Sequence, residues 1–526
     1  AEFTVLILGD LARDSDSASI NAQVRAQQRR RSMRRLDKLV GALLQRRART
    51  EDLILVSASP PEAKRASSSI WSSLTPVLAT GPDFPAGLLT SATTRTAGLV
   101  ANSDLAPTIL NLYHVPTPQV MEGRPISVAP MPGSANRLAI LRRQDRMSRL
   151  NGSAPGPVMA PIGGFCFLSA LAGIIARRRR GAAASRPFAP FMVFTQNMAA
   201  ATLIAATLST PSVLAYGIEI ALLMALLTPL CYLAAQLTGR SPIVAGAIGG
   251  LALIAADTVT GQHMVKNSLF SGYALSGIRY YGVGNEFLGL TVGLGLMAAF
   301  ALLDDLARNA SRQVGPGAEP GEYAAGPPAA ASRGPNWLIG ILWVVLLFLL
   351  GWPAFGANAG SLPVCAVGFG LGWVTLRGGR VTWRNWLALV LLGILLMAAF
   401  GALDAAIWRS NGSHLASAAS ALQTGAGRLR LTAIAFRKML MNLRLLVSPW
   451  LMLAAGVFAA TILAARWIAG EQLTELLSVR QQTKRGLYAL GAAAATALLL
   501  KDSGVVCATY LIGSACPITL YYLFTM

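Results

Sequence analysis

The feature that most constrains this chain is a series of apolar runs that begins at Pro157 and recurs to the C-terminus. Most runs reach about 20 residues, which is the length that an α-helix needs to cross the hydrocarbon core of a bilayer. Only 13% of the residues are charged and 54% are hydrophobic, whereas a soluble domain carries about 25% charged residues. The sequence therefore predicts a polytopic membrane protein.

We expect a membrane domain over residues 151–526 with about eleven helices, each an apolar run of spanning length. The predicted spans are 157–176, 188–209, 212–237, 241–260, 287–306, 336–353, 358–376, 386–408, 446–468, 487–501 and 505–525. Segment 311–335 is rich in Pro, Gly and Ala, which predicts a disordered loop. Residues 151–155 are polar and predict a turn before the first span.

Residues 1–150 have a different pattern and predict a separate α/β domain. Strand-like runs at 3–10 and 52–60 bracket an amphipathic helical stretch at about 21–49. Strand, helix and strand in this order predict parallel strands. Because the chain begins without Met and inside a strand-like run, we expect this domain to be truncated at its N-terminus.

A second helix is expected near the end of this domain. "NSDLAPTILNLYHV" opens with Ser103 or Asp104 as the helix cap and places Pro107 in the first turn, where the missing N–H of proline costs nothing.

The net charge of +22 bears on partners and on orientation. Many basic residues flank apolar runs, where they set topology and contact anionic headgroups. A nucleic-acid-binding domain would instead carry them on one soluble surface. We therefore expect membrane lipids as partners and no nucleic acid. The arginines at 177–180 predict a cytoplasmic loop, which places residues 1–150 outside the cytoplasm.

Segment 409–445 does not fit this orientation, because it would lie outside and yet is basic. Arg430, Arg437 and Arg444 are seven residues apart and share one helix face. Two interpretations remain open: an interfacial amphipathic helix against lipid headgroups, or a span that has been miscounted.

The five cysteines predict neither a disulfide framework nor a zinc site. All lie in or beside apolar segments, and none forms a CxxC pattern or a Cys/His cluster. We interpret them as small apolar packing residues.

One stretch of the first domain resembles a known family. "NSDLAPTILNLYHVPTPQVMEGRPISV" at 102–128 resembles the C-terminal end of domains of the alkaline phosphatase superfamily, which includes sulfatases and phosphoglycerate mutases. A pattern common in that superfamily has an Asp, then the pair Pro-Thr, and further along a Pro and a Gly. The resemblance covers roughly residues 1–130 and implies an α/β fold with a metal-dependent hydrolytic ancestry.

The sequence departs from that family where the metal ligands are implied. At the position of the usual "SDHG", residues 57–60 read "SASP". Thr93 and Thr94 stand where the superfamily often has a ligand His, and His114 is the one histidine of residues 1–150. A two-metal centre needs Asp and His ligands at fixed places to polarise a phosphoryl group. We therefore expect a degenerate pseudoenzyme domain with no evident cofactor, and whether the chain is an enzyme remains open.

Polar residues of three membrane-domain segments form the candidate site. The predicted topology places the end of span 241–260, the loop "GYALSGIRYYGVGNEFLG" at 272–289 and "KDSG" at 501–504 on the outer side. Ionisable residues near spans are costly and usually face a partner or water. The candidate residues are Asp257, Asn267, Arg279, Tyr280, Asn285, Glu286, Asp502 and Ser503.

These residue types fit two kinds of chemistry and one structural role. Arg279 can grip a phosphate or carboxylate with two hydrogen bonds. Asp257, Glu286 or Asp502 can act as a base or hold a divalent metal ion through oxygen ligands. In the structural alternative, Arg279 pairs with Glu286, and Asp502 with its neighbour Lys501, and the pairs only fix the loops.

The membrane part is similar to uncharacterised bacterial envelope proteins with a "RYYGxGNE" loop and a "DSG" turn, which implies the bacterial cytoplasmic membrane.

Three functions follow from the alternatives for the candidate site. The chain can be an envelope protein that acts on a phosphorylated or lipid-linked substrate. It can be a non-enzymatic transporter or flippase whose soluble domain binds partners. It can also be a scaffold without chemistry.

Overall fold

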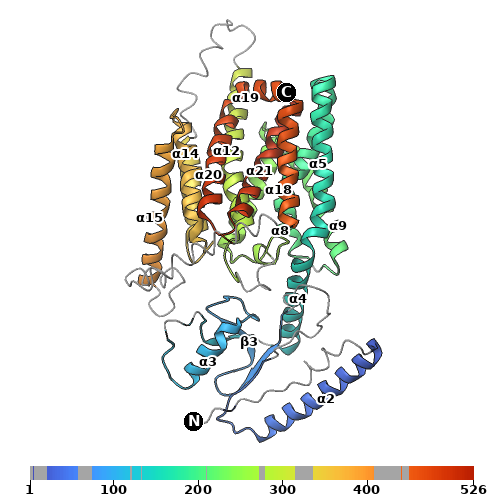
Figure 1. Cartoon of the computed structure of the whole chain (residues 1–526), viewed down its shortest axis with the longest axis vertical. Helices are drawn as coiled ribbons and strands as arrows, with labels where there is room; N and C mark the ends of the chain where they lie inside the picture. The colour runs from blue at the N-terminus through green and yellow to red at the C-terminus, as the bar shows by residue number, and fades with distance from the viewer. Residues whose placement is uncertain are drawn as a thin grey trace. The chain divides into compact units, whose positions relative to one another are not determined.

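The computed structural model describes residues 4, 21–56, 74–118, 121, 123–131, 133–208, 210–271, 279–313, 336–407, 440 and 449–526. The chain forms two compact units (Figure 1). The first unit comprises Ala1–Gly152 with Tyr273–Tyr280, and the second comprises Ser153–Gly272 with Tyr281–Met526. The division lies close to the boundary expected at residue 150.

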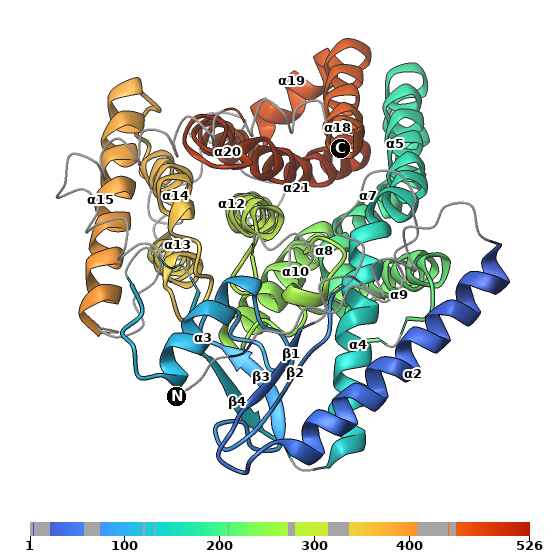
Figure 2. The same ribbon diagram turned by 60° about the horizontal axis from the view of Figure 1, so that its bottom comes forward.

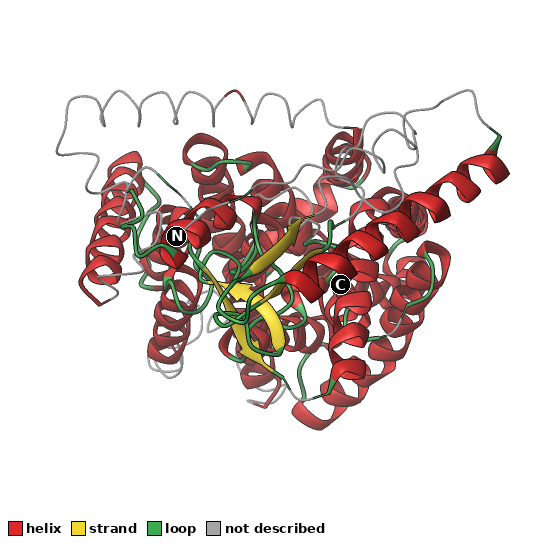
Figure 3. Ribbon diagram, turned by 90° about the horizontal axis from the view of Figure 1, so that it is seen from below, coloured by secondary structure: helices red, strands yellow, loops and turns green. Residues whose placement is uncertain are grey.

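The first unit combines helices with two small sheets. Its described elements are α2 (Ala22–Arg46), β1 (Leu53–Val56), β2 (Val77–Thr80), β3 (Gly87–Ser91), η1 (Asn102–Asp104), α3 (Leu105–Leu112), β4 (Ile126–Pro130) and α4 (Ser134–Ser153). β1 pairs with β2, with Leu53 opposite Thr80, and β3 pairs with β4, with Gly87 opposite Pro130. The strands are drawn in yellow in Figure 3.

Both described strand pairs are antiparallel, whereas the pattern of strand, helix and strand predicted a parallel pair. The sequence could not reveal that the partner of β1 is β2, which follows it. The other predicted strand, 3–10, lies outside the described residues except for Thr4, so its pairing stays a prediction. The helix expected at 21–49 is confirmed as α2, and the side chain of Asn21 caps it by accepting a hydrogen bond from the Gln23 N–H at 3.0 Å.

The second unit is built from helices, as expected of a polytopic membrane domain. They are α5 (Pro155–Arg180), α6 (Ala182–Ser185), α7 (Ala189–Gln196), α8 (Met198–Ala205), α9 (Val213–Thr238), α10 (Pro242–Val259), α12 (Asn285–Gln313), α13 (Asn336–Gly351), α14 (Leu362–Leu376), α15 (Trp383–Ile407), α18 (Pro449–Ile468), α19 (Gly470–Val479), α20 (Gln481–Leu500) and α21 (Gly504–Thr525).

Eight helical segments within the described residues are long and apolar enough to cross a membrane. They are Pro155–Arg180, Ala182–Ala205, Val213–Thr238, Pro242–Val259, Asn285–Ala310, Ala359–Leu376, Trp383–Leu403 and Gly504–Thr525. The chain is therefore a multi-pass membrane protein by the length and composition of its helices.

The expected count of eleven spans is not supported. Spans 336–353 and 446–468 correspond to the shorter apolar helices Asn336–Gly351 and Ala455–Ile468. Span 487–501 falls within α20, whose first residues read "QQTKR" and lower the mean hydropathy of the helix.

Three segments that connect the predicted helices either differ from the prediction or lie outside the described residues. The turn expected at 151–155 is a break at Ala154 alone, because Pro155 starts α5 directly and proline suits the first helical turn. Residues 311–313 of the loop expected at 311–335 belong to α12. The basic segment 409–445 lies outside the described residues except for residue 440.

The centre of the second unit is the pair α12 and α21. Figure 2 shows α12 surrounded by α10, α13, α14, α20 and α21. A Cβ atom at Gly289 would lie 2.4 Å from the carbonyl oxygen of Cys507, and one at Gly293 would lie 2.0 Å from Ser514 Oγ. Two glycines four residues apart therefore bring the backbones of the two helices together.

Candidate functional site

Asp257, the first candidate residue, closes a turn at the end of α10. Its Oδ1 accepts a hydrogen bond from the Met264 N–H at 2.9 Å, and its Oδ2 accepts one from the Val265 N–H at 2.7 Å. These donors lie at the start of η3 (Val265–Asn267). A buried carboxylate that accepts one backbone bond on each oxygen has the geometry of a turn cap, which favours a structural role.

Gln262, in the same turn, connects three loops and was missed by the sequence analysis. Its Nε2 donates to the Phe355 carbonyl, and its Oε1 accepts from the Gly282 N–H at 2.5 Å. Its backbone φ is +62°, a conformation uncommon for a residue other than glycine. The sequence "TGQH" does not by itself indicate that its glutamine connects loops, because the two hydrogen-bond partners lie in distant segments.

Asn358 joins the same loops to the start of α21. Its Nδ2 donates to the Val283 carbonyl at 2.7 Å, and its Oδ1 accepts from Lys501 Nζ at 2.7 Å. The Val283 N–H donates in turn to the Gly356 carbonyl at 2.6 Å. The Lys501 side chain is buried, with 3% of the residue exposed, so an ammonium group is positioned inside the protein where three non-helical segments meet.

Two candidate segments of the membrane domain meet directly. Asn285 Nδ2 donates to the Asp502 carbonyl at 2.9 Å. Ser503 follows with a φ of +54° and precedes α21. A Cβ atom at Gly504 would lie 1.9 Å from the Ala497 carbonyl oxygen, so this sharp turn requires glycine.

Charges of both signs surround one buried thiol at this place. Glu286 and Lys501 both interact electrostatically with Cys507, and Glu286 also does so with Tyr510. We define the loop-end cluster as Gln262, Asn285, Glu286, Asn358, Lys501 and Asp502. These side chains come from four segments that are distant in sequence and lie at one end of the helical unit.

Three other candidates are not among the residues that define the loop-end cluster. Asn267 Nδ2 donates to the His263 carbonyl at 2.9 Å in an exposed turn. Arg279 and Tyr280 belong to the first unit. Burial raises the pKa of Tyr280, and the nearby Asp104 carboxylate raises that pKa further. The expected pairing of Arg279 with Glu286 joins residues of different units and stays a prediction.

Asp104 is the centre of a buried network in the first unit. Its Oδ2 accepts from Ser91 Oγ at 2.6 Å and from the Ala101 N–H at 2.9 Å. Its Oδ1 accepts from Thr93 Oγ1 and from the Arg124 N–H. Asp104 precedes α3 as expected, but its side chain makes no capping bond to that helix and instead ties together β3, the loop after it and the approach to β4.

Other residues of the family-like motif serve the same scaffold. Thr108 Oγ1 donates to the Asp104 carbonyl at 2.6 Å and accepts from the Ile126 N–H at 2.8 Å. A Cβ atom at Gly123 would lie 2.0 Å from the Ser103 carbonyl oxygen. The Asp, Thr and Gly of the motif are therefore explained by hydrogen bonding and close packing.

A second polar network, also missed by the sequence analysis, lies near the other end of α12. Arg480 forms a buried ion pair with Asp305 at 3.0 Å, and its guanidinium stacks on Tyr522 at 3.3 Å from the ring centre. Ser241 donates to Asp305 through its backbone N–H at 2.9 Å and through its hydroxyl at 2.5 Å. The sequence did contain a signal for this network, because two adjacent aspartates, Asp304 and Asp305, lie near the end of the apolar run 287–306.

The neighbouring Asp304 caps α20. It accepts from the Gln482 and Thr483 N–H groups at 3.1 and 2.8 Å, and from Thr483 Oγ1 at 2.6 Å. Asn285 and Asp305 are 20 residues apart on α12, which is about 30 Å along the helix. The two polar regions of the second unit therefore lie a membrane thickness apart.

Among the described residues, no group of three or more His, Cys, Asp or Glu side chains is placed to hold a metal ion. No family model, no curated protein and no solved structure matches this chain.

Proposed function

We propose that this protein is a transporter or flippase of the bacterial cytoplasmic membrane, whose loop-end cluster binds a phosphorylated or lipid-linked anionic substrate. The observation that carries the proposal is the position of Lys501. Its buried ammonium group stands where α12, the helix Ala359–Leu376 and α21 all begin. Helix N-termini carry partial positive charge and unpaired N–H groups, so they favour an anion.

The surrounding backbone supports binding and movement of a substrate. Irregular backbone at membrane depth is tolerated where it is buried in protein or lines a cavity. In transporters such interruptions place helix ends at the substrate. Segments 282–284, 352–358 and 501–503 are interruptions of this kind, and their mutual hydrogen bonds hold Lys501 in place.

A group-transfer enzyme with Asp257 as its base is less well supported, because this carboxylate is already engaged. Both oxygens of Asp257 accept backbone hydrogen bonds in the turn that it closes. A general base needs a carboxylate oxygen within reach of the substrate proton. The geometry around Asp257 therefore favours a structural role for this residue over a role as general base.

The first unit fits a degenerate phosphatase-like domain that binds partners. Thr93, at a position where the family often has a metal ligand, donates its hydroxyl to Asp104. The first unit precedes α5, and Arg178 lies at the far end of that helix. Arg178 and Arg480 belong to the end of the second unit opposite the loop-end cluster, and basic residues mark the cytoplasmic side. The first unit would therefore lie outside the cytoplasm.

The test is the binding of a lipid phosphate to the purified full-length protein. We expect a polyprenyl phosphate to raise the temperature of thermal unfolding, whereas the neutral polyprenol does not. Lys501→Gln should weaken this binding at least about tenfold, because a charged hydrogen bond is worth about 1.5–3 kcal/mol. Lys484→Gln, an exposed lysine on α20, is the matched control and should bind like the wild type. Equal binding by Lys501→Gln and wild type, or equal effects of phosphate and alcohol, would contradict the proposal.

A further inference from the structure

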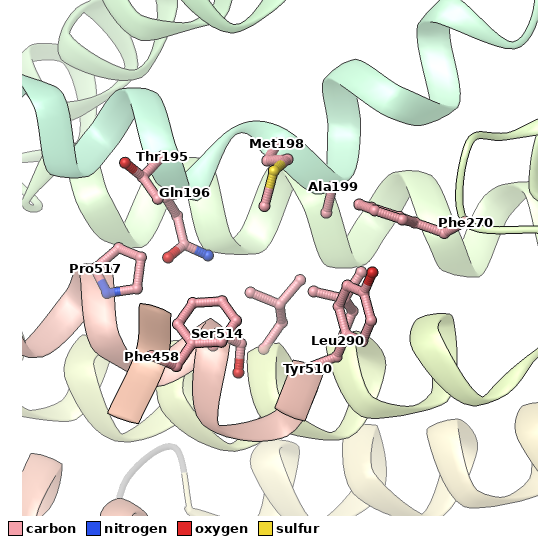
Figure 4. A pocket seen from close by; sticks show the side chains of 12 residues that line it. Thr195, Gln196, Met198, Ala199, Phe270, Leu290, Phe458, Tyr510, Ser514 and Pro517 are labelled. Atoms are coloured by element: carbon pink, nitrogen blue, oxygen red, sulfur yellow. The ribbon is translucent and has the colours of Figure 1, made fainter. Parts of the chain in front are cut away.

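A small pocket lies inside the second unit, beside the break between α7 and α8 (Figure 4). Its volume is about 30 Å³, and α7, α8, α12, α18 and α21 contribute to its lining. Apolar side chains such as Phe270, Leu294 and Phe458 form most of the wall. Four polar residues also line the pocket: Thr195, Gln196, Tyr510 and Ser514.

Gln196 is the unusual member of this set. Only 5% of the residue is exposed, and its Oε1 has no hydrogen-bond partner. Figure 4 shows its amide group directed into the pocket. A buried acceptor without a donor costs about 1–3 kcal/mol. The pocket therefore has room beside an oxygen that requires a donor.

The opposite wall offers further oxygens. Ser514 Oγ donates to the Leu511 carbonyl at 2.7 Å, so its lone pairs remain available to a donor. Tyr510 packs edge-on against Phe270, with ring centres 5.1 Å apart. Its hydroxyl is the one polar group of these two side chains. A guest in the pocket can thus bridge α7 and α21 by hydrogen bonds.

The volume decides which guest fits. A water molecule needs about 10–15 Å³ of such space and two to four polar partners. The pocket is therefore large enough for about two water molecules and too small for a sugar ring. An acyl chain would fill space but would leave Gln196 Oε1 without a donor.

We infer that this pocket is a hydration site in the membrane interior, where water donates to Gln196 Oε1 and links the α7–α8 break to α21. The site is distinct from the loop-end cluster, because Tyr510 and Ser514 lie six and ten residues beyond Gly504. That is about 9–15 Å further along α21. The inference does not depend on the proposed transport function.

Radiolytic labelling of the purified full-length protein tests the inference. A brief X-ray pulse converts bound water into hydroxyl radicals that modify adjacent side chains, and mass spectrometry locates the modification. A soluble radical scavenger removes labelling by bulk water. We expect Tyr510 to be modified several-fold faster than the buried Tyr522 and Phe300, and to keep that rate in the scavenger.

Two variants complete the experiment. Gln196→Leu removes the acceptor and should lower the Tyr510 rate to that of the buried controls. Thr202→Val alters a buried hydroxyl that donates to the backbone of its own helix and should leave the rate unchanged. A wild-type Tyr510 rate no higher than the controls would mean a dry or lipid-filled pocket and would overturn the inference. So would an unchanged rate in a folded Gln196→Leu protein.

Discussion

At the scale of single residues, the structure shows which groups hold the buried charges in place. Asp104 accepts four hydrogen bonds within the first unit. Asp257 accepts two backbone bonds in its turn. Lys501 donates to the side-chain oxygen of Asn358 at a junction of helix N-termini. The partners of Asp104 and Asp257 thus assign both carboxylates a structural role, and the proposed binding site centres on Lys501.

Asp104→Ala should unfold or strongly loosen the first unit. The change leaves two hydroxyls and two N–H groups without their acceptor, and each unsatisfied buried group costs about 1–3 kcal/mol. We expect a loss of about 3 kcal/mol or more, measured as the urea dependence of proteolysis of this unit in the full chain. Asp83→Ala, an exposed aspartate on a neighbouring turn, should change the stability by about 0.5 kcal/mol or less. Equal effects of the two variants would refute the scaffold role.

At the scale of elements, the closest packing of the second unit is that of α12 on α21. Glycines at 289 and 293 permit it, and the ordering of Lys501, Tyr510 and Ser514 depends on where α21 lies. The break between α7 and α8 is a second element-level feature, because it brings Gln196 to the same helix.

Gly289→Ala should destabilise the membrane unit by about 1–3 kcal/mol, the usual cost of overpacking. The added methyl group would meet the Cys507 carbonyl oxygen at 2.4 Å, and a backbone atom cannot turn aside. Gly249→Ala on α10 is the matched control, because nothing lies within 4 Å of its added Cβ. The control should be neutral or stabilising by up to about 1 kcal/mol, since alanine favours helix over glycine. Detergent unfolding followed by circular dichroism measures both, and a neutral Gly289→Ala would show that the helices are not held so closely.

At the scale of the whole molecule, the two ends of the membrane unit are organised differently. The loop-end cluster is made of loops and helix starts. The opposite end is held by the ion pair of Arg480 and Asp305, with Ser241 and Tyr522 joining α10 and α21 to it. A transporter that opens alternately would have to separate the second network.

Arg480→Ala should cost about 3–5 kcal/mol, because it leaves the buried Asp305 carboxylate without its cation. Arg178→Ala tests the exposed pair with Glu471, whose side chains are 50% and 82% exposed, and should cost at most about 1 kcal/mol. Thermal unfolding of the two purified variants provides the comparison. Losses of equal size would mean that the Arg480 network does not hold this end together.

Sequence patterns predicted the features that depend on neighbours along the chain. The helical membrane unit and α2 follow from apolar runs and helical spacing, which are local properties. The count of eleven spans is not supported, because eight helices of the described residues are long and apolar enough to cross a membrane. The partner of β1 was missed because strand pairing is decided by segments that are apart in the sequence.

The sequence by itself determined that this is a multi-pass membrane protein with a separate mixed N-terminal unit, because hydrophobicity and its periodicity are written residue by residue. It also predicted a candidate site of eight residues, and the structure joins two of them, Asn285 and Asp502, by a hydrogen bond. Only the tertiary structure decided that Asn358 contacts Lys501, that Gln262 connects distant loops, that Asp305 pairs with Arg480, and that Gln196 faces a pocket. Each of these depends on contacts between segments brought together by helix packing, and no local pattern encodes such contacts.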